Sequence, residues 1–417
     1  MAKDVIIIGA GVIGLCAAHY ALQNGHRVTI LERGAPDHDC CSLGNAGMIV
    51  PSHVVPLAAP GAVGYALRSM WNPESPFYLR PRLDASLLAW GLRFWRISNS
   101  AHVARAAPLL RDLHLSSREC YEELARSRDN DFGLVRRGLL MLCRTRCGLE
   151  EEARTAGLIR RLGIPAEVLN PEQTAALDPG VKMNVAGSVY FPKDCHMSPD
   201  RFVASLVRGL ESGGAAFRWQ TEVTGWLTGG SRVNAVQTSR GEFAAEEFVL
   251  ACGAWSQTVS RGLGLRLVLQ AGKGYSLTLS RPRRLPTLCS ILSEARVAVT
   301  PMGTSLRIGG TMEIAGLDES VNPARVRGIV KAVPQYFPEF QREDFAQVRP
   351  WCGLRPCSAD GLPYIGRTAR YSNLVVATGH AMMGMSLGPV TGKLVAEVLS
   401  SERPSINIEL LSPDRFS

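Results

Sequence analysis

The sequence has no dense block of basic residues, although its net charge is +9. Its arginines are scattered along the chain, from Arg27 to Arg415. Nucleic-acid binding needs basic residues gathered on one surface, so this pattern argues against nucleic acid as a partner and leaves anionic substrates or an anionic membrane surface open. A composition of 46% hydrophobic and 20% charged residues indicates a folded globular protein.

The sequence also lacks a C-x-x-C pair, although it contains 11 cysteines. The closest pairs are Cys40 with Cys41, Cys143 with Cys147, and Cys352 with Cys357. None has the spacing of a zinc site, so we expect no metal and buried free thiols. No basic leader or cleavage site precedes the first apolar stretch, which predicts a reducing, cytoplasmic location.

A long uninterrupted apolar run is missing too. Residues 5–22 are apolar enough to imitate a membrane span, but three glycines and a change of period make them a strand followed by a helix. At 417 residues the chain exceeds one ordinary core. Its length therefore predicts two domains with enough volume for a buried cofactor.

The chain opens with a strand, a glycine-rich turn and a helix. Residues 5–8 are β-branched, which is typical of a strand buried on both faces. Gly9 allows a tight turn, Gly11 lets the backbone approach a pyrophosphate, and Gly14 lets the helix pack on the strand. The free amides at the start of this helix would then face the phosphates.

A second strand, residues 27–31, ends at Glu32. An acidic residue about 20 positions after such glycines is placed to bind the ribose hydroxyls. Because all these parts occur in the right order, we predict a dinucleotide site. Glu32 favours FAD or NAD over NADP, since a carboxylate disfavours a 2′-phosphate. A glycine-rich turn without a ligand is the alternative, and it leaves the coincidence of the parts unexplained.

Small residues dominate the next segment, residues 34–49, which suggests backbone pressed against a flat ring beyond the pyrophosphate. An ordinary surface loop is the alternative. Within this segment residues 44–49, Gly-Asn-Ala-Gly-Met-Ile, and then residues 51–61 closely resemble the corresponding part of bacterial D-amino-acid dehydrogenases. These enzymes belong to the FAD-dependent family that also holds D-amino-acid oxidase, glycine oxidase and sarcosine oxidase.

The resemblance covers essentially the whole chain and implies that the dinucleotide is FAD and not NAD. Some sarcosine-oxidase-like members attach their flavin through a cysteine. Neither Cys352 nor Cys357 clearly matches that position, so noncovalent FAD is expected.

The resemblance also implies the cofactor contacts. It assigns Val223 a backbone contact to the adenine and matches residues 248–256 to the second dinucleotide-facing turn of the family. A helix beginning near Gly384 would bring its positive end to the pyrimidine side of the flavin. The expected cofactor-binding residues are Gly9, Gly11, Val12, Ile13, Gly14, Glu32, Arg33, Ser42, Asn45, Ala46, Gly47, Met48, Val223, Cys252, Gly253, Trp255, Gly353, Gly384, Met385, Ser386 and Leu387.

Four residues are candidates for substrate contact. Residues 353–356, Gly-Leu-Arg-Pro, resemble the family motif whose arginine, here Arg355, grips the substrate carboxylate through two parallel donors. A structural ion pair is the alternative for Arg355. Tyr275 either reaches the substrate pocket or packs in a sheet. His380 either faces the substrate or completes a turn, and His53 lies in the first resembling stretch.

The predicted fold class is α/β with an α+β substrate part. A Rossmann-like FAD-binding domain is expected from three segments, residues 1–55, 196–262 and 345–417. A substrate domain is expected from residues 56–195 and 263–344, with a mostly antiparallel sheet because strand-like stretches there alternate with turns.

Residues 87–97 combine bulky aromatics with arginines. Such a helix suits a membrane interface, which would fit a dehydrogenase that passes electrons to quinone. An amphipathic helix covering the substrate domain is favoured, because the apolar residues do not fill one clean stripe. The inner face of the cell membrane thus stays an open alternative to a purely cytoplasmic location.

The resemblance implies oxidative deamination of D-amino acids by hydride transfer from Cα to flavin N5, giving an imine or a 2-oxo acid. D-proline or D-hydroxyproline would leave as a cyclic imine, and the electrons would pass to quinone or another acceptor. The alternatives are an oxygen-using amine, glycine or sarcosine oxidase, an NAD(P)-linked reductase, and a non-catalytic flavoprotein subunit. The reductase would need a second nucleotide fingerprint, which we do not find, and Arg355 argues against the non-catalytic subunit.

Overall fold

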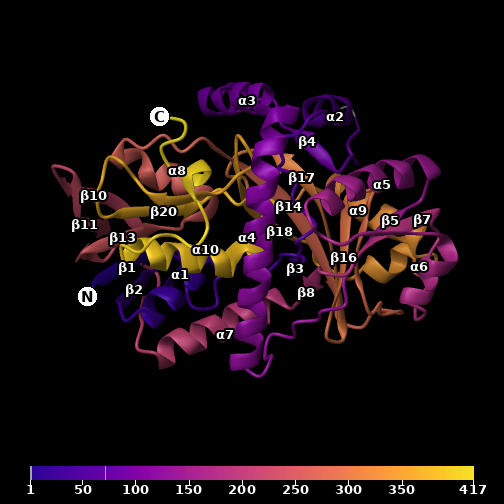
Figure 1. The fold of residues 1–417 in the computed structure, drawn as a ribbon, viewed down its shortest axis with the longest axis horizontal. Coiled ribbons are helices and arrows are strands. Elements are labelled where there is room, and N and C mark those ends of the chain that lie inside the picture. Colours follow the sequence, from indigo (N-terminus) through magenta and orange to yellow (C-terminus); the bar gives the residue numbers. More distant parts are fainter. Residues whose placement is uncertain (1, 71) are drawn as a thin grey trace.

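The computed structural model describes residues 2–70 and 72–417. Figure 1 shows two sheet-centred halves side by side, with both termini on the left-hand half and one long helix standing between the halves. The fold class is the predicted α/β fold with a substrate part rich in antiparallel strands.

The left-hand half is built on a six-stranded sheet whose order is β19-β20-β13-β1-β2-β9. All neighbouring strands are parallel except β19 and β20. The strands are β1 (Asp4–Ile8), β2 (Arg27–Leu31), β9 (Ala216–Arg218), β13 (Glu247–Leu250), β19 (Tyr364–Arg367) and β20 (Leu374–Thr378). The β-branched sequence of β1 is buried, as expected for a parallel strand covered on both faces.

Two helices pack tightly on this sheet, α1 (Val12–Gln23) and α10 (Gly384–Leu399). Glycines make the close approach possible: a Cβ at Gly392 would overlap the backbone of Cys16, and one at Gly388 would lie 3.0 Å from Cγ2 of Val12. The start of α10 is therefore held beside the glycine-rich turn that begins α1. Helix α7 (Pro199–Ser212) packs along the other side of α1.

Smaller elements complete this half. A three-stranded antiparallel sheet joins β10 (Val223–Gly229), β11 (Arg232–Thr238) and β12 (Gly241–Ala244). Short helical turns are η1 (Gly253–Trp255), α8 (Ser256–Val259), η2 (Ser260–Leu263), η4 (Ala381–Met383) and η5 (Glu409–Leu411).

The right-hand half is built on a nine-stranded sheet. Its order is β18 (Trp351–Ser358), β14 (Leu269–Leu279), β17 (Ser305–Ile314), β16 (Val297–Met302), β15 (Cys289–Leu292), β5 (Leu139–Cys143), β7 (Gly187–Phe191) and β6 (Glu167–Leu169), with β4 (Phe77–Leu79) paired to β17. Neighbours are antiparallel except β15 with β5 and β17 with β4. Helices α5 (Arg146–Arg161), α6 (Pro171–Leu177) and α9 (Pro323–Tyr336) and the turn η3 (Arg342–Phe345) accompany this sheet.

Strand β18 connects the two halves. It lies within residues 345–417, the segment expected in the cofactor domain, yet it pairs along its whole length with β14 of the large sheet. The expected domain boundaries stay a prediction. Through β18, a segment expected in the cofactor domain forms part of the large sheet. Strand β18 forms one end of the strand order of the large sheet and contacts η1 and η4 of the left-hand half.

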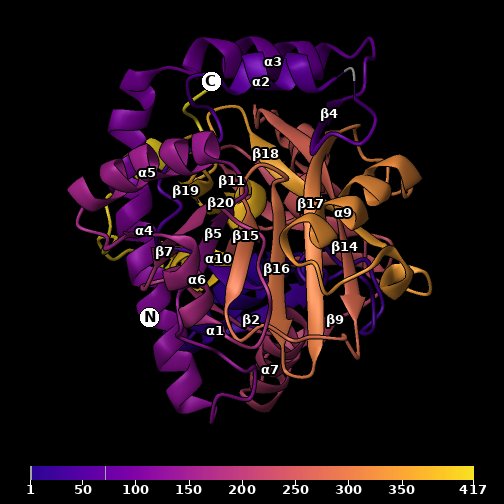
Figure 2. The same cartoon turned by 90° about the vertical axis from the view of Figure 1, so that its right-hand side faces the viewer.

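Helix α4 (Ser100–Ser127) is the long helix between the halves and packs against α10. A short pair, β3 (Met48–Ile49) with β8 (Cys195–His196), lies near it. Helices α2 (Ala62–Ser69) and α3 (Ala85–Ile97) lie side by side at the top of Figures 1 and 2. Across residues 2–70 and 72–417, no helix has the length and apolar content required to cross a bilayer.

Candidate active site

A cavity of about 990 Å³ lies between the two halves. The carboxyl ends of β1, β2, β13 and β20 contribute Ile8, Leu31, Ala251 and Thr378 to its wall. Strand β18 of the large sheet contributes the opposite wall. Ligands of open parallel sheets bind outside the carboxyl ends of the strands, where the strand order reverses direction, so this cavity lies at the expected place.

The start of α1 forms one part of the wall. Gly11 caps this helix without any side-chain hydrogen bond, and a Cβ on Gly11 would meet only Oγ of Ser42, at 3.6 Å. The amide of Val12 donates to the same Ser42 oxygen at 3.0 Å. Open space above backbone amides at a helix N-terminus suits a diphosphate.

Glu32 lies at the end of β2 with its carboxylate held in place. Its Oε2 accepts from the amide of Ala10 and its Oε1 accepts from the amide of Gly34, both at 2.8 Å. Nε2 of His38 is 3.9 Å from Oε2. Hydrogen bonding to Cys40, with help from the charge of Glu32, raises the pKa of His38 to about 9, so this cavity wall carries an imidazolium at neutral pH.

A stacked pair closes the cavity near Glu32. The guanidinium carbon of Arg33 lies 3.9 Å from the centroid of the Trp255 ring. Val223 and Cys252 line the wall beside this pair. A flat base would fit against such a wall, since aromatic and guanidinium planes both stack on rings.

Arg355 projects from β18 into the cavity wall. Its Nη1 donates to the carbonyl oxygen of Thr311 at 2.6 Å, and no other donor of this side chain has a hydrogen-bond partner among the described residues. No carboxylate in the described ranges pairs with it. Burial lowers the pKa of the Arg355 guanidinium, which means that the site disfavours the charge it holds unless an anion joins it.

Comparison with known proteins identifies the family. A family model described as FAD dependent oxidoreductase matches residues 4–398. The chain belongs to this family. Its cofactor is therefore FAD, which confirms the prediction.

Relatives match over the full length of this FAD-dependent oxidoreductase. It is 32% identical to a D-amino acid dehydrogenase of Bradyrhizobium diazoefficiens, covering 99% of each chain. A D-amino acid dehydrogenase of Agrobacterium fabrum is 31% identical and is covered completely, by 99% of this chain. Among solved structures, glycine oxidase from Geobacillus kaustophilus is similar with a TM-score of 0.80 and 25% identity, over 100% of this chain and 99% of that chain.

The residues present fit FAD. The α1 amides would bind the diphosphate and Glu32 the ribose, while the wall of Arg33 and Trp255 would receive the adenine. The start of α10 reaches the cavity through Gly384 and Met385, and its cap residue makes no side-chain hydrogen bond, so its amides stay available to the flavin.

His380 lies beside these amides in the wall of the FAD cavity. Its Nε2 lies 2.9 Å from Oγ1 of Thr391, and its buried Nδ1 has no partner among the described residues. Burial lowers the pKa of His380 to about 3, so the ring is neutral at physiological pH.

The two other candidates for substrate contact lie outside the cavity lining. Tyr275 donates to Oε2 of Glu313 at 2.7 Å and accepts from the amide of Asn322 at 3.3 Å, within the core of the large sheet. Nδ1 of His53 lies 3.0 Å from Oγ of Ser52. Burial lowers the pKa of His53 to about 4.

Most of the expected cofactor residues are brought together. The cavity is lined by Gly9, Gly11, Val12, Ile13, Glu32, Arg33, Ser42, Asn45, Val223, Cys252, Gly253, Trp255, Gly353, Gly384 and Met385. The expected residues set back from its wall are Gly14, Ala46, Gly47, Met48, Ser386 and Leu387. Gly14 instead permits packing, because a Cβ there would overlap the carbonyl oxygen of Gly9.

The structure adds wall residues that the sequence did not single out, among them Glu319 and Trp351, as well as His38 and Cys41 within the segment 34–49 that was expected near the ring. The indole Nε1 of Trp351 donates to Asp39, at 2.7 Å from Oδ1. Strand alternation offered a signal here, since Trp351 stands four positions before Arg355 and shares its face of β18. His38, Cys41 and Glu319 lie in irregular loops, where no periodicity marks a facing residue.

Proposed function

We propose that this protein is an FAD-dependent dehydrogenase that oxidises D-amino acids to imines, which water converts to 2-oxo acids. Arg355 carries the proposal. A half-buried guanidinium in the wall of a cofactor cavity, with unpaired donors and no carboxylate partner in the described residues, suits the carboxylate of an amino acid. The two relatives named D-amino acid dehydrogenase support the handedness of the substrate and the dehydrogenase activity.

The chemistry that FAD supplies, when bound, is acceptance of a hydride. Arg355 would hold both carboxylate oxygens and thereby orient the Cα–H bond, which is the main catalytic contribution of the protein. His380 would add a neutral polar contact without a charge that competes for the carboxylate. We assign no general base, because the neutral form of the substrate amine can release hydride unaided.

We further propose that FAD is held without a covalent bond. The amides of α1 and α10, together with Glu32, offer enough contacts for tight noncovalent binding. Precipitation with acid should therefore release the yellow colour into the supernatant. Colour retained by the pellet would show a covalent link.

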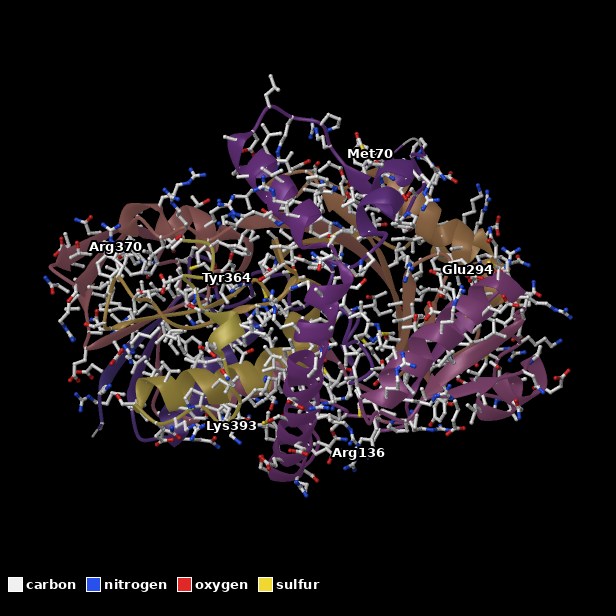
Figure 3. The ribbon with its side chains drawn as sticks, turned by 45° about the horizontal axis from the view of Figure 1, so that its top comes forward. Met70, Arg136, Glu294, Tyr364, Arg370 and Lys393 are labelled. Carbon is white, nitrogen blue, oxygen red and sulfur yellow. The ribbon has the colours of Figure 1, made fainter. Side chains whose placement is uncertain are left out.

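The electron acceptor is proposed to be a membrane quinone, with the protein resting on the inner face of the cell membrane. Support comes from α3, whose outer face carries Leu88, Leu92 and Trp95 with exposed fractions of 67%, 47% and 62%. Figure 3, which brings the top of Figure 1 forward, shows side chains of α2 and α3 pointing outward, with Met70 at the end of α2. An apolar stripe on a helix rich in Trp and Arg suits a membrane interface.

The decisive experiment is anaerobic reduction of the purified yellow protein by a panel of D- and L-amino acids. Bleaching of the flavin absorbance by D-enantiomers and not by L-enantiomers is expected, with proline and hydroxyproline included to define the substrate. Turnover with a soluble quinone or dye, measured beside an oxygen electrode, separates a dehydrogenase from an oxidase. A colourless protein that could not be reconstituted, or one reduced only by L-amino acids, would refute the proposal.

Replacement of Arg355 tests the site directly. Arg355→Ala should keep FAD bound while kcat/KM falls by about 10³-fold, as expected for the loss of two charge-assisted hydrogen bonds. Arg355→Lys keeps the charge without the two parallel donors, so its kcat/KM should lie between that of the wild type and that of Arg355→Ala. Kinetics like those of the wild type in Arg355→Ala would remove this assignment.

A further inference from the structure

The first turn of α10 is not completed by its own helix. Pro389 stands inside α10 and has no amide hydrogen. In an α-helix the amide of residue 389 would donate to the carbonyl oxygen of Met385, four positions earlier, and the proline ring also crowds that carbonyl. The turn that reaches the FAD cavity is therefore weakly coupled to the rest of the helix.

Helix α4 supplies the missing donor. The hydroxyl of Tyr121 donates to the carbonyl oxygen of Met385 at 2.5 Å. Ser117 donates to the carbonyl oxygen of Ser386 at 2.7 Å, and Nδ1 of His114 lies 3.0 Å from Oγ of Ser386. The three α4 residues stand at i, i+3 and i+7, so they form one stripe facing α10.

The contacts of this stripe are specific and buried. Tyr121, Ser117 and His114 are all 0% exposed. Burial lowers the pKa of His114 to about 3, so its ring is neutral. Oγ of Ser386 also accepts from the amide of Val50 at 3.0 Å, and the tautomer of His114 decides whether Oγ or Nδ1 is the donor between them. The hydroxyls of Tyr121 and Ser117 are each paired with a carbonyl of α10, so a shift between the two helices would leave buried polar groups unsatisfied. Nε2 of His114 has no partner among the described residues.

We infer that Tyr121, supported by Ser117, is a positioning residue that aims the first-turn amides of α10 at FAD and thereby raises the reduction potential of the bound flavin. The inference rests on the proposed cofactor site, in which Gly384 and Met385 line the cavity. None of the α4 stripe lines the cavity, so the effect passes through the backbone of α10. Amides fixed before reduction stabilise the negative charge that reduction creates.

The test is the midpoint potential of bound FAD, measured by equilibration with a redox dye and a chemical reductant. Tyr121→Phe removes only the hydroxyl and should shift the potential by about −30 mV, the equivalent of a tenfold change for a two-electron couple. Tyr336→Phe is the matched control, because it also removes a buried hydroxyl, which donates to Oε2 of Glu294 in the other half. This control should leave the potential unchanged.

Pro389→Ala provides a rescue. An alanine at position 389 has an amide hydrogen that can donate to the carbonyl oxygen of Met385. The hydroxyl of Tyr121 then becomes partly redundant as a donor to that oxygen. In that background, Tyr121→Phe should shift the potential by less than half as much. The difference between the two shifts measures the coupling between the two sites.

An unchanged potential in Tyr121→Phe, or an equal shift in both backgrounds, would overturn the inference. If Tyr121→Phe cannot hold FAD, the same measurement on Ser117→Ala decides, and an unchanged potential there overturns it. Because the reductant is chemical, this result is independent of the substrate. A wild-type protein that binds FAD but is not reduced by D-amino acids would refute the proposed function and leave this measurement intact.

Discussion

At the scale of single residues, the position of Arg355 lowers the stability of the folded protein. Arg355 is half-buried, and a guanidinium partly removed from water without an anionic partner costs free energy to desolvate. Room for it is provided by Gly274 on the neighbouring strand, where any Cβ would overlap the guanidinium. This cost is offset when a bound carboxylate supplies the missing negative charge. Arg355 and Gly274 together therefore suit a subsite for the substrate carboxylate.

Gly274→Ala tests this subsite without removing the arginine. The added methyl should push the flexible guanidinium aside and raise KM for the D-amino acid about tenfold, as expected for an overpacking cost near 1.4 kcal/mol. Binding of FAD should not change. Gly157→Ala is the control, since its Cβ would meet only Nη1 of Arg161, at 4.0 Å. A KM like that of the wild type in Gly274→Ala would place the carboxylate elsewhere.

At the scale of elements, α3 shows why its sequence does not form one apolar stripe. It carries two stripes. Leu87, Trp90 and Phe94 are buried against the large sheet, where the indole of Trp90 donates to the carbonyl of Cys357 at 3.0 Å. Leu88, Leu92 and Trp95 form the second stripe, which faces outward. The two sequence-based alternatives, a covering helix and an interfacial helix, therefore describe opposite faces of the same element.

The outer stripe predicts binding to anionic vesicles at low salt. Leu88→Ser with Leu92→Ser and Trp95→Ser should reduce the vesicle-bound fraction about tenfold or more, because each change removes apolar area from the interface. Activity with a soluble dye should stay within twofold. Val168→Ser removes an exposed apolar side chain from β6, at the end of the large sheet opposite β18 and β14, and serves as the control. A wild-type protein that ignores such vesicles would contradict the membrane proposal.

At the scale of the whole molecule, local patterns predicted the first βαβ unit well. The apolar run of β1, the glycine turn and Glu32 lie within one short segment, so their meaning does not depend on distant packing. The position of Tyr275 relative to the substrate pocket could not be predicted from the local pattern. Its neighbour Gly274 faces Arg355, whereas the Tyr275 side chain points to the other side of the sheet and packs in the core there. Whether a sheet residue meets a ligand depends on which face the other half covers, and that is decided by tertiary packing.

Some features were beyond sequence reasoning for the same reason. The hydroxyl that completes the first turn of α10 comes from Tyr121, 264 positions before Met385. Nothing local to Pro389 indicates which distant side chain replaces its missing amide. The pairing of β18 with β14 likewise needs the large sheet to exist first.

In the molecule as a whole, buried histidines and a buried aspartate have shifted pKa values that change the stability in opposite directions as the pH falls. Their summed effect predicts how the stability responds to acid. Burial lowers the pKa of His114 and His380 to about 3 and that of His19, His53 and His196 to about 4, so between these values and 6.5 the unfolded chain binds protons that the folded protein excludes. Their stabilisation is complete above pH 6.5 and is lost as the pH falls. Burial raises the pKa of Asp194 to about 7, which has the opposite sign between 3.8 and 7.

Five histidines outweigh one aspartate when each pKa unit is worth about 1.4 kcal/mol, so the free energy of unfolding should fall as the pH drops from 7 to 5. Asp194→Asn removes the opposing contribution and should make the fall steeper, whereas Glu242→Gln, an exposed change on β12, should not. Urea unfolding at a fixed excess of FAD measures the three slopes. Equal slopes for the wild type and Asp194→Asn would mean that Asp194 is ionised in the folded protein, held by its hydrogen bonds from Ser52.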